Sequence, residues 1–421
     1  MRKKILFIIS RSFYPTTGGR EVVIYNYIDG LNRIYNCDVD VALFCDDEEA
    51  EGIRKLDVVN NLFILKNISK LQKMRNVLIN TILRRTWPLQ VSVFYDKDVQ
   101  RQINKIVSEN NYNSIITDMV RTSEYLRGND SFEGGKILDM DDMLSNRYKK
   151  QYELGNSNVN ILGQYSKKLP KLVGKMCNSK NLSKFILKFE ADLLSKYEVE
   201  VSKDFDKVIF VSKKEASQLN NILKCNKAID ITIGVDYEYL SRHISEKKEK
   251  TICFLGNMNV AHNRQSVDYF LKQILPLIKN EVQGIKFKIV GKCDEQYKKE
   301  MEVYEDVEVT GLVEDIREHI QSCSVAIAPI LFGSGIKTKV LETMAMGVPV
   351  VMNSIGAEGI DLVNEENAMI TDDWNQFAKY VVEIINDNLK RDYISSNAQK
   401  FVKENHTWDN TLKNFEVILN N

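Results

Sequence analysis

The stretch that decides the fold is PILFGSGIKTKVLETMAMGVPVV, residues 329–351. A short apolar run, Val325–Ile330, leads into a glycine-punctuated loop, and an amphipathic segment, Lys339–Met346, follows and ends at Gly347. This order predicts a strand, a flexible turn, a helix and a second strand. The turn opens onto the N-terminus of the helix, where unpaired N–H groups and a partial positive charge suit a phosphate.

Short β-rich runs alternate with helical patterns along the whole chain. The expected strands of the first half are Ile5–Ile9, Val39–Phe44, Asn61–Leu65, Ser114–Thr117, Lys136–Met140 and Lys207–Val211. Those of the second half are Thr251–Leu255, Lys286–Val290, Val307–Val309, Val325–Ile330 and Val348–Met352. The expected helices between the first strands include Glu21–Arg33, Asp98–Glu109 and Glu215–Lys224. Nearly continuous apolar strands that alternate with helices predict parallel sheets covered on both faces, that is, doubly wound α/β domains.

Length and charge favour two such domains. A chain of 421 residues is long for one core, and the charged stretch 246–250 is typical of a linker. Residues 251–421 carry 17 Lys and Arg against 25 Asp and Glu, whereas residues 1–250 carry 41 against 33. The two halves therefore differ in net charge, −8 against +8, which predicts different partners for each.

Composition argues against several classes of protein. The seven cysteines and four histidines are scattered without metal-ligand spacing, so we expect neither a disulfide framework nor a zinc site. The apolar run Ile5–Ile9 is too short for a signal peptide, and no later run is long enough to span a bilayer. We expect a soluble, cytoplasmic protein with reduced cysteines.

Glycine loops follow several expected strands. Gly18 and Gly19 follow the first strand of the first domain, and Gly256 follows the first strand of the second. In open parallel sheets, ligands bind at the carboxyl ends of the strands, where helix N-termini converge. With two such domains, we expect the site in the cleft between them.

The chain resembles a known family through motifs in a specific order. These are FYPTTGGREVVIYNYIDGL at 13–31, FVSKKEASQL at 210–219, FLGNMNVAHNRQSVDYF at 254–270, KIVGKCDE at 288–295, VTGLVEDIREHI at 309–320 and GAEGI at 356–360, together with the opening stretch. In these motifs the chain resembles the retaining GT-B-fold glycosyltransferases of the large bacterial group 1 (family 4) type, which build surface polysaccharides.

The resemblance implies two Rossmann-like domains that face a central cleft. It implies an acceptor-side domain at 1–240 and a nucleotide-sugar donor domain at 241–404, with a final helix at 405–421 that packs back on the first. The implied activity is the metal-independent, hexosyltransferase-like transfer of a sugar, with retention, from a nucleotide diphosphate sugar to a glycan or polyprenyl-linked acceptor. The nucleotide sugar is then a co-substrate, and no cofactor is expected.

The resemblance also assigns roles to two residues that share a helical face, Lys339 and Glu342. Lys339 would meet the donor diphosphate and neutralise the leaving group, and Glu342 would accept hydrogen bonds from the ribose hydroxyls. A surface ion pair between the two side chains is the alternative. The family's signature places another glutamate at the position of Ser334, so this chain departs from it there, which puts the identity of the sugar in doubt.

Further donor-binding candidates come from the loops of both domains. They are Gly18, Gly19, Gly256, Asn257, Arg264, Gly333, Ser334, Gly335, Ile336, Lys337 and Glu358. A plain tight turn also accounts for Gly18 and Gly19, helix capping accounts for Glu358, and a solvent-exposed loop position accounts for His262.

Acidic residues follow two strands of the first domain. Asp118 is a candidate catalytic base at one strand end, with Arg121 nearby. Asp139, Asp141 and Asp142 follow the next strand. They belong either to the site or to a structural turn. We infer no metal from this triplet, because the resembling fold neutralises its leaving group with cations and helix dipoles.

Two basic segments of the first domain, residues 64–90 and 161–190, favour an anionic membrane surface. Solvated helical faces are the alternative, and a nucleic-acid partner is not expected because no recognition motif is present. The location would then be peripheral at the inner face of the plasma membrane. Two rivals for the function stay open, namely a catalytically silent, glycosyltransferase-like binding subunit and a nucleotide-sugar epimerase of the same fold.

Overall fold

The computed structural model of the chain describes residues 2–16, 18–127, 129, 131–153, 180–246, 250–301, 303–333 and 335–419, with the backbone alone at 180–183. Two compact units make up the chain. The first is Met1–Thr232 with Leu412–Asn421, and the second is Ile233–Thr411. The sequence places the first boundary at residue 240 instead, within the loop-rich segment that opens the second unit.

The first unit is built on a seven-stranded parallel sheet in the order β3-β2-β1-β4-β5-β6-β7. Its strands are β1 Lys4–Ile9, β2 Asp38–Leu43, β3 Asn61–Ile64, β4 Ser114–Asp118, β5 Gly135–Asp141, β6 Lys207–Phe210 and β7 Ala228–Asp230. Its described helices are α1 Gly19–Arg33, α2 Asp47–Arg54, α3 Lys70–Asn76, the π-helix η1 Val77–Leu83, α4 Leu89–Ser92, α5 Lys97–Glu109, α6 Met119–Thr122, α7 Glu124–Arg127, α8 Leu144–Glu153, α10 Lys180–Lys203, α11 Lys213–Leu223, the 3-10 helix η4 Leu412–Phe415 and α21 Glu416–Leu419.

The second unit is built on a six-stranded parallel sheet in the order β10-β9-β8-β11-β12-β13. Its strands are β8 Thr251–Leu255, β9 Lys286–Val290, β10 Val307–Gly311, β11 Val325–Ala328, β12 Val350–Met352 and β13 Met369–Ile370. Its described helices are α12 Tyr237–Leu240, α13 Ala261–Tyr269, the π-helix η3 Phe270–Ile274, α14 Leu275–Glu281, α15 Glu295–Met301, α16 Ile316–Ile320, α17 Thr338–Ala345, α18 Trp374–Asn386, α19 Asn388–Asn405 and α20 Trp408–Thr411.

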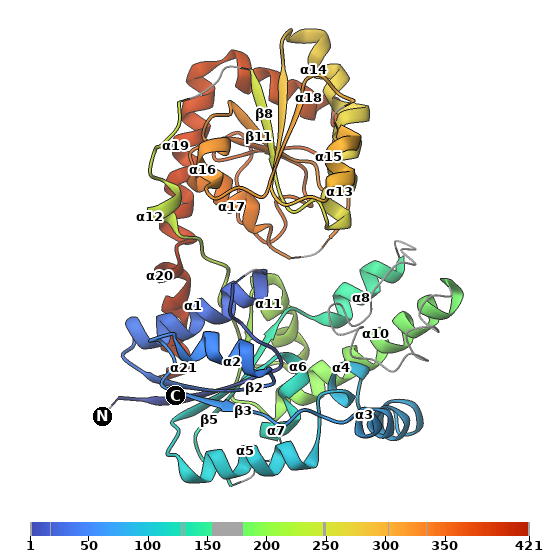
Figure 1. The fold of residues 1–421 in the computed structure, drawn as a ribbon, viewed down its shortest axis with the longest axis vertical. Helices are drawn as coiled ribbons and strands as arrows, with labels where there is room; N and C mark the ends of the chain where they lie inside the picture. Colours follow the sequence, from blue (N-terminus) through green and yellow to red (C-terminus); the bar gives the residue numbers. More distant parts are fainter. Residues whose placement is uncertain are drawn as a thin grey trace. The chain divides into compact units, whose positions relative to one another are not determined.

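In each unit, helices lie on both faces of the sheet (Figure 1). The predicted doubly wound class is therefore confirmed, because central strands such as β1 and β8 are buried on both faces, as their apolar runs require. Two edge strands, β7 and β13, were not predicted. Each is only two or three residues long, so its pattern is too short to stand out from a loop.

The chain's last described residues pack on the first unit. The rings of Tyr27 and Phe415 meet edge to face at 5.0 Å. Tyr35 donates a hydrogen bond from its hydroxyl to the carbonyl of Leu412 at 2.9 Å. A Cβ at Gly30 would lie 2.3 Å from a terminal methyl group of Leu412, so a larger residue on helix α1 would displace that side chain. Within the described residues, no helix is both long and apolar enough to cross a bilayer.

Candidate functional site

The decisive stretch forms the loop between β11 and α17 in the second unit. Gly333 and Gly335 adopt left-handed backbone conformations, with φ of 131° and 79°, which side chains other than glycine rarely accept. Asn353 fixes the start of the loop, because its side chain donates to the carbonyl of Ile330 at 2.8 Å and accepts from the Ile330 N–H at 3.1 Å. Ser334 lies outside the described residues.

Lys339 is the central cation of this site. Its Nζ donates to Oδ1 of Asn263 at 2.6 Å and lies 4.2 Å from the centre of the Phe254 ring. Burial, with a smaller contribution from the charge of Lys337, lowers the pKa of Lys339 to about 7. No ion pair joins Lys339 to Glu342 in the described part of the chain, so the alternative of a surface ion pair is wrong.

Glu342 lies half-buried one turn along α17. Burial raises the pKa of this carboxyl, and neither a cation nor a hydrogen bond among the described residues opposes that effect. An uncompensated carboxylate in such a place is costly to keep charged, and hydroxyl donors from a ligand would stabilise it.

His262 stands beside the two lysines. The sequence allowed a solvent-exposed loop position, but His262 belongs to α13 and is half-buried, with its ring edge-on to Phe332 at 6.2 Å. Burial, followed by the charges of Lys339 and Lys337, lowers its pKa to about 4. Its imidazole is therefore neutral near pH 7 and offers one donor and one acceptor.

Lys337, the other basic residue of the predicted site, is buried at the end of the loop. Its Nζ donates to the carbonyl of Gly335 at 2.6 Å, which holds the glycine loop against its own helix start.

The segment after β8 reaches Lys339 through Asn263, which lies in the first turn of α13. The side chain of Asn263 donates to the carbonyl of Asn257 at 2.9 Å while it accepts from Lys339. Gly256 packs against Asn263, since a Cβ at position 256 would lie 3.0 Å from Nδ2 of Asn263. At Gly291, a Cβ would lie 2.3 Å from the Gly256 carbonyl, so β9 also needs glycine at this strand end.

Arg264 has partners within the chain. It donates to Asp294 at 2.7 Å and to the carbonyl of Met258 at 3.1 Å, and its guanidinium lies 4.5 Å from the Tyr297 ring centre. Its charge is therefore already balanced by a carboxylate, and its role towards a diphosphate stays a prediction.

Glu358 belongs to the loop after β12, which packs against the glycine loop. Gly359, with φ of 82°, is close enough to Ile336 that a Cβ would lie 2.9 Å from its side chain. The structure thus brings Glu358, itself half-buried, into the same loop cluster as Ile336.

In the first unit, Gly18 precedes α1 as its N-cap residue and Gly19 begins the helix. A Cβ at Gly18 would lie 2.1 Å from a carboxylate oxygen of Glu21, whereas one at Gly19 would meet nothing within 4 Å. The contact at Gly18 is with the tip of a flexible side chain that can move, so close packing accounts for glycine at neither position.

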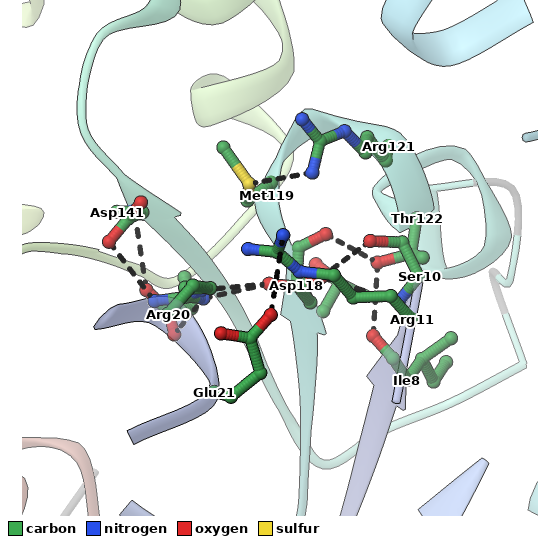
Figure 2. A network of polar contacts seen from close by, with 12 residues as sticks. Ile8, Ser10, Arg11, Arg20, Glu21, Asp118, Met119, Arg121, Thr122 and Asp141 are labelled. Carbon is green, nitrogen blue, oxygen red and sulfur yellow. Dashed lines mark hydrogen bonds and ion pairs between the residues drawn. The ribbon is translucent and has the colours of Figure 1, made fainter. Parts of the chain in front are cut away.

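Arg20 meets aspartates at or near the carboxyl ends of two strands, β4 and β5 (Figure 2). Its guanidinium donates to Asp118 at 2.8 Å, to Asp139 at 2.6 Å and to Asp141 at 3.2 Å. Asp118 is almost fully buried and also accepts from the hydroxyl of Ser10 at 2.7 Å.

The charges of this cluster perturb one another. Burial disfavours the charge of Arg20, but the three aspartates outweigh it and raise its pKa. Burial likewise opposes the charge of Asp118, and Arg20 overcomes it, so the pKa of Asp118 falls. Burial raises the pKa of Asp139 to about 6 despite Arg20. Among the described residues, no group of three or more His, Cys, Asp or Glu is arranged to hold a metal ion.

The chain is similar to known proteins in part of its sequence and in its fold. Residues 249–387 match the model of the family described as "Glycosyl transferases group 1". These residues contain Asn263, Lys339 and Glu342. The match lies within the second unit and covers about a third of the chain.

One curated relative and two solved structures are similar to this chain, and the solved structures share its fold. An uncharacterised 44.6 kDa protein of the cps region of Klebsiella pneumoniae is 26% identical over 215 residues, which cover 49% of this chain and 54% of the relative. The chain thus spans about half the length of that relative. Sucrose-phosphate synthase from Thermosynechococcus elongatus is 14% identical with a TM-score of 0.65, over 100% of this chain and 98% of the other. HepE of Anabaena in complex with UDP-glucose is 15% identical with a TM-score of 0.61, over 99% of each chain. The fold is GT-B.

Sequence reasoning missed the contacts of Asn263 and His262 around Lys339. Both residues belong to the FLGNMNVAHNRQSVDYF motif, in which Arg264 was predicted to bind the donor because it is charged. A signal was present in the helical spacing, because Asn263 and Ser266 lie three apart and both face the core.

Proposed function

We propose that this protein transfers a sugar from a nucleoside diphosphate sugar to a glycan or lipid-linked acceptor, with retention of configuration and without a metal. The observation that carries the proposal is the half-buried Lys339, which is held by Asn263 beside a neutral His262 at the start of α17. A lysine with a pKa near 7 is poised to gain charge when a diphosphate arrives, because the phosphate charge favours its protonated form.

Different residues of the second unit would bind different groups of the donor. Lys339, with the N–H groups that begin α17, would neutralise the charge that develops on the diphosphate as the glycosidic bond breaks. His262 would give or accept one hydrogen bond at the same group. Glu342 would accept from the ribose hydroxyls, which relieves its burial without a counter-ion.

The similar proteins support this choice of substrates. The structure of HepE was solved with UDP-glucose, and a relative comes from a cps region. We extend these observations to a nucleotide-sugar donor, a hexosyl group and a role in polysaccharide assembly. We also propose a cytoplasmic location, to which the free cysteines of the described residues are suited.

The first unit would hold the acceptor. Asp118 is a candidate base by its place at a strand end, but its oxygens are engaged by Arg20 and Ser10. We therefore propose that Asp118 positions Arg20 and neighbouring strand ends and does not itself touch the reacting atoms.

A panel of UDP-, GDP-, ADP- and dTDP-sugars tests the proposal through donor hydrolysis and through transfer to glycan acceptors. We expect turnover with one donor, and a loss of at least about 100-fold in kcat/KM in Lys339→Ala, since a charge-assisted contact to the leaving group is removed. Lys272→Ala, an exposed lysine of the same unit, serves as the control.

Other outcomes of this panel identify the rivals. A changed sugar without release of the nucleotide indicates an epimerase. Nucleotide-sugar binding without turnover indicates a silent subunit. Unchanged turnover and nucleotide affinity in Lys339→Ala would refute the proposed site.

A further inference from the structure

The helical stretch formed by α3 and η1 packs on the first unit through polar side chains. Asn76 is buried and donates to the carbonyls of Ser92 and Tyr95 at 3.0 and 2.7 Å. Thr81 is also buried, and its hydroxyl lies 2.7 Å from that of Ser92. The inward face of this stretch is therefore fixed by hydrogen bonds to its neighbours, with Val77 adding one apolar contact.

Its outward face is apolar. Five large side chains, which we call the outer face, are between 52% and 77% exposed, and they are Leu71, Met74, Leu78, Ile82 and Leu83. A helix on a water-soluble surface normally turns its apolar stripe towards the core and its polar residues outwards. Here the apolar side chains face outwards and the polar ones face the unit. Single exposed apolar residues are common on protein surfaces, but a contiguous set of them marks an interaction site.

The charge around the outer face has one sign. From residue 64 to residue 90 the sequence contains no Asp or Glu, and the helical stretch and its end carry Lys70, Lys73, Arg75, Arg84 and Arg85. Lys70, Arg75, Arg84 and Arg85 are exposed. A partner that complements this surface must be apolar in one layer and anionic in the next.

A further exposed apolar residue lies on the neighbouring helix α10. The guanidinium of Arg85 lies 5.8 Å from the ring centre of Phe189, which places the end of η1 beside α10. On the same helix Phe185 is 66% exposed, between the exposed residues Lys184 and Lys188. The pattern of the outer face thus continues onto a neighbouring element. Of the basic segment 161–190, residues 161–179 lie outside the described residues.

We infer that the outer face inserts into the interface of an anionic lipid bilayer, with the surrounding Lys and Arg side chains on the lipid headgroups. A bilayer supplies both layers that the surface requires, since an amphipathic helix lies with its apolar side about 5–10 Å into the headgroup and acyl boundary. Basic side chains then meet the negative surface potential of the headgroups. The binding does not depend on glycosyl transfer. Its consequence, that the acceptor is drawn from the membrane, rests on the proposed function.

Vesicle flotation of the full chain, without any donor, tests the inference. We expect binding to vesicles of phosphatidylcholine mixed with phosphatidylglycerol, because the anionic lipid gives the vesicle a negative surface potential that attracts basic side chains. Pure phosphatidylcholine should bind at least about tenfold more weakly, since each cation near an anionic surface contributes about fivefold.

Two double variants separate the apolar part of the binding from the charged part. Leu78→Ser with Ile82→Ser should weaken binding to anionic vesicles by at least about tenfold, because two inserted side chains are lost. Lys70→Gln with Arg84→Gln should weaken anionic binding by about 25-fold, at about fivefold per charge, and leave neutral binding unchanged. Both pairs are exposed, so their circular dichroism and melting should match those of the wild type.

A matched control uses the same chemistry away from the outer face. Ile222→Ser with Lys214→Gln changes an exposed apolar residue and an exposed lysine of α11, and should bind like the wild type. Equal flotation with neutral and anionic vesicles, or wild-type binding by both double variants, would overturn the inference.

Another occupant of the outer face would also overturn it. Dimers in sedimentation velocity without lipid that disappear in Leu78→Ser with Ile82→Ser would assign the face to a second copy of the chain. Because no nucleotide sugar enters these measurements, their failure leaves transfer to a water-soluble acceptor untouched, and the two proposals fail separately.

Discussion

Replacement of Asn263 by alanine tests whether the site depends on how Lys339 is held. The variant removes the acceptor 2.6 Å from Lys339 Nζ and the donor 2.9 Å from the Asn257 carbonyl. A hydrogen bond to a charged group contributes about 1.5–3 kcal/mol. If Lys339 needs this contact to face the leaving group, that loss appears in kcat/KM as a decrease of about 10- to 150-fold.

The assay is donor hydrolysis and transfer with the nucleotide sugar that the panel selects, measured as kcat and KM over pH 5.5–9. The Asn263→Asp variant tests for more than a structural role, because a purely structural role of Asn263 would leave the pH dependence of the reaction unchanged. A carboxylate beside Lys339 would raise the pKa of the lysine from its present value of about 7, so the alkaline limb of the pH profile should move to higher pH.

Ser266→Ala is the matched control, because Ser266 is buried on the same helix and donates only to the carbonyl of His262 at 2.8 Å. It should cost about 1 kcal/mol of stability and less than about threefold in kcat/KM. An Asn263→Ala enzyme within twofold of the wild type, or an Asn263→Asp profile that does not move, would refute the reasoning that Asn263 positions Lys339.

Three further predictions address charge. Affinity for the matching nucleoside diphosphate, measured by calorimetry, should fall as pH rises through and above 7, because Lys339 loses its proton there, and Lys339→Arg should abolish this dependence; a wild-type affinity that is flat from pH 6 to 9 would contradict it. Arg20→Met should destabilise the chain in urea by about 3–5 kcal/mol, since buried carboxylates lose their counter-ion, whereas Arg33→Met on the same helix should cost less than about 1 kcal/mol; similar losses in both would count against the buried network. Burial raises the pKa of Glu198 to about 8, above its unfolded value, so its contribution to stability is present at acidic pH and is lost as pH rises towards 8. Glu198→Gln, which keeps an acceptor for the Ser145 N–H, should therefore match the wild type near pH 4 and exceed its melting temperature near pH 8, and identical melting curves at both pH values would argue against a buried neutral carboxyl.

The sheets were readable from the sequence because parallel strands buried on both faces leave near-continuous apolar runs. The strand Thr251–Leu255 was predicted with the bounds that the structure shows, and Ile5–Ile9 differs by one residue. The edge strands β7 and β13 were missed because an edge needs few residues and little apolar pattern. The end of the strand in the opening stretch was placed at Ile330 rather than Ala328, since the apolar side chains continue past the last ladder pair.

The candidate site was only partly readable. The glycines of the loop were identifiable because Gly333 and Gly335 need left-handed backbone, a local property. The carboxylate partner of Arg264, by contrast, follows another strand, since Asp294 is 30 positions away, and no local pattern connects the two residues.

The sequence by itself determined two parallel α/β units, the phosphate-suited loop at residues 329–351 and the basic character of residues 64–90, because backbone conformation, apolar period and charge are properties of neighbouring residues. The tertiary structure alone decided that Asn263 holds Lys339 over Phe254, that Arg20 unites Asp118, Asp139 and Asp141, and that Leu78 and Ile82 face outwards. These facts depend on which side chains, distant in the sequence, pack together. Burial among them lowers the pKa of Lys339, and packing against neighbouring elements decides which side of a helix faces the solvent.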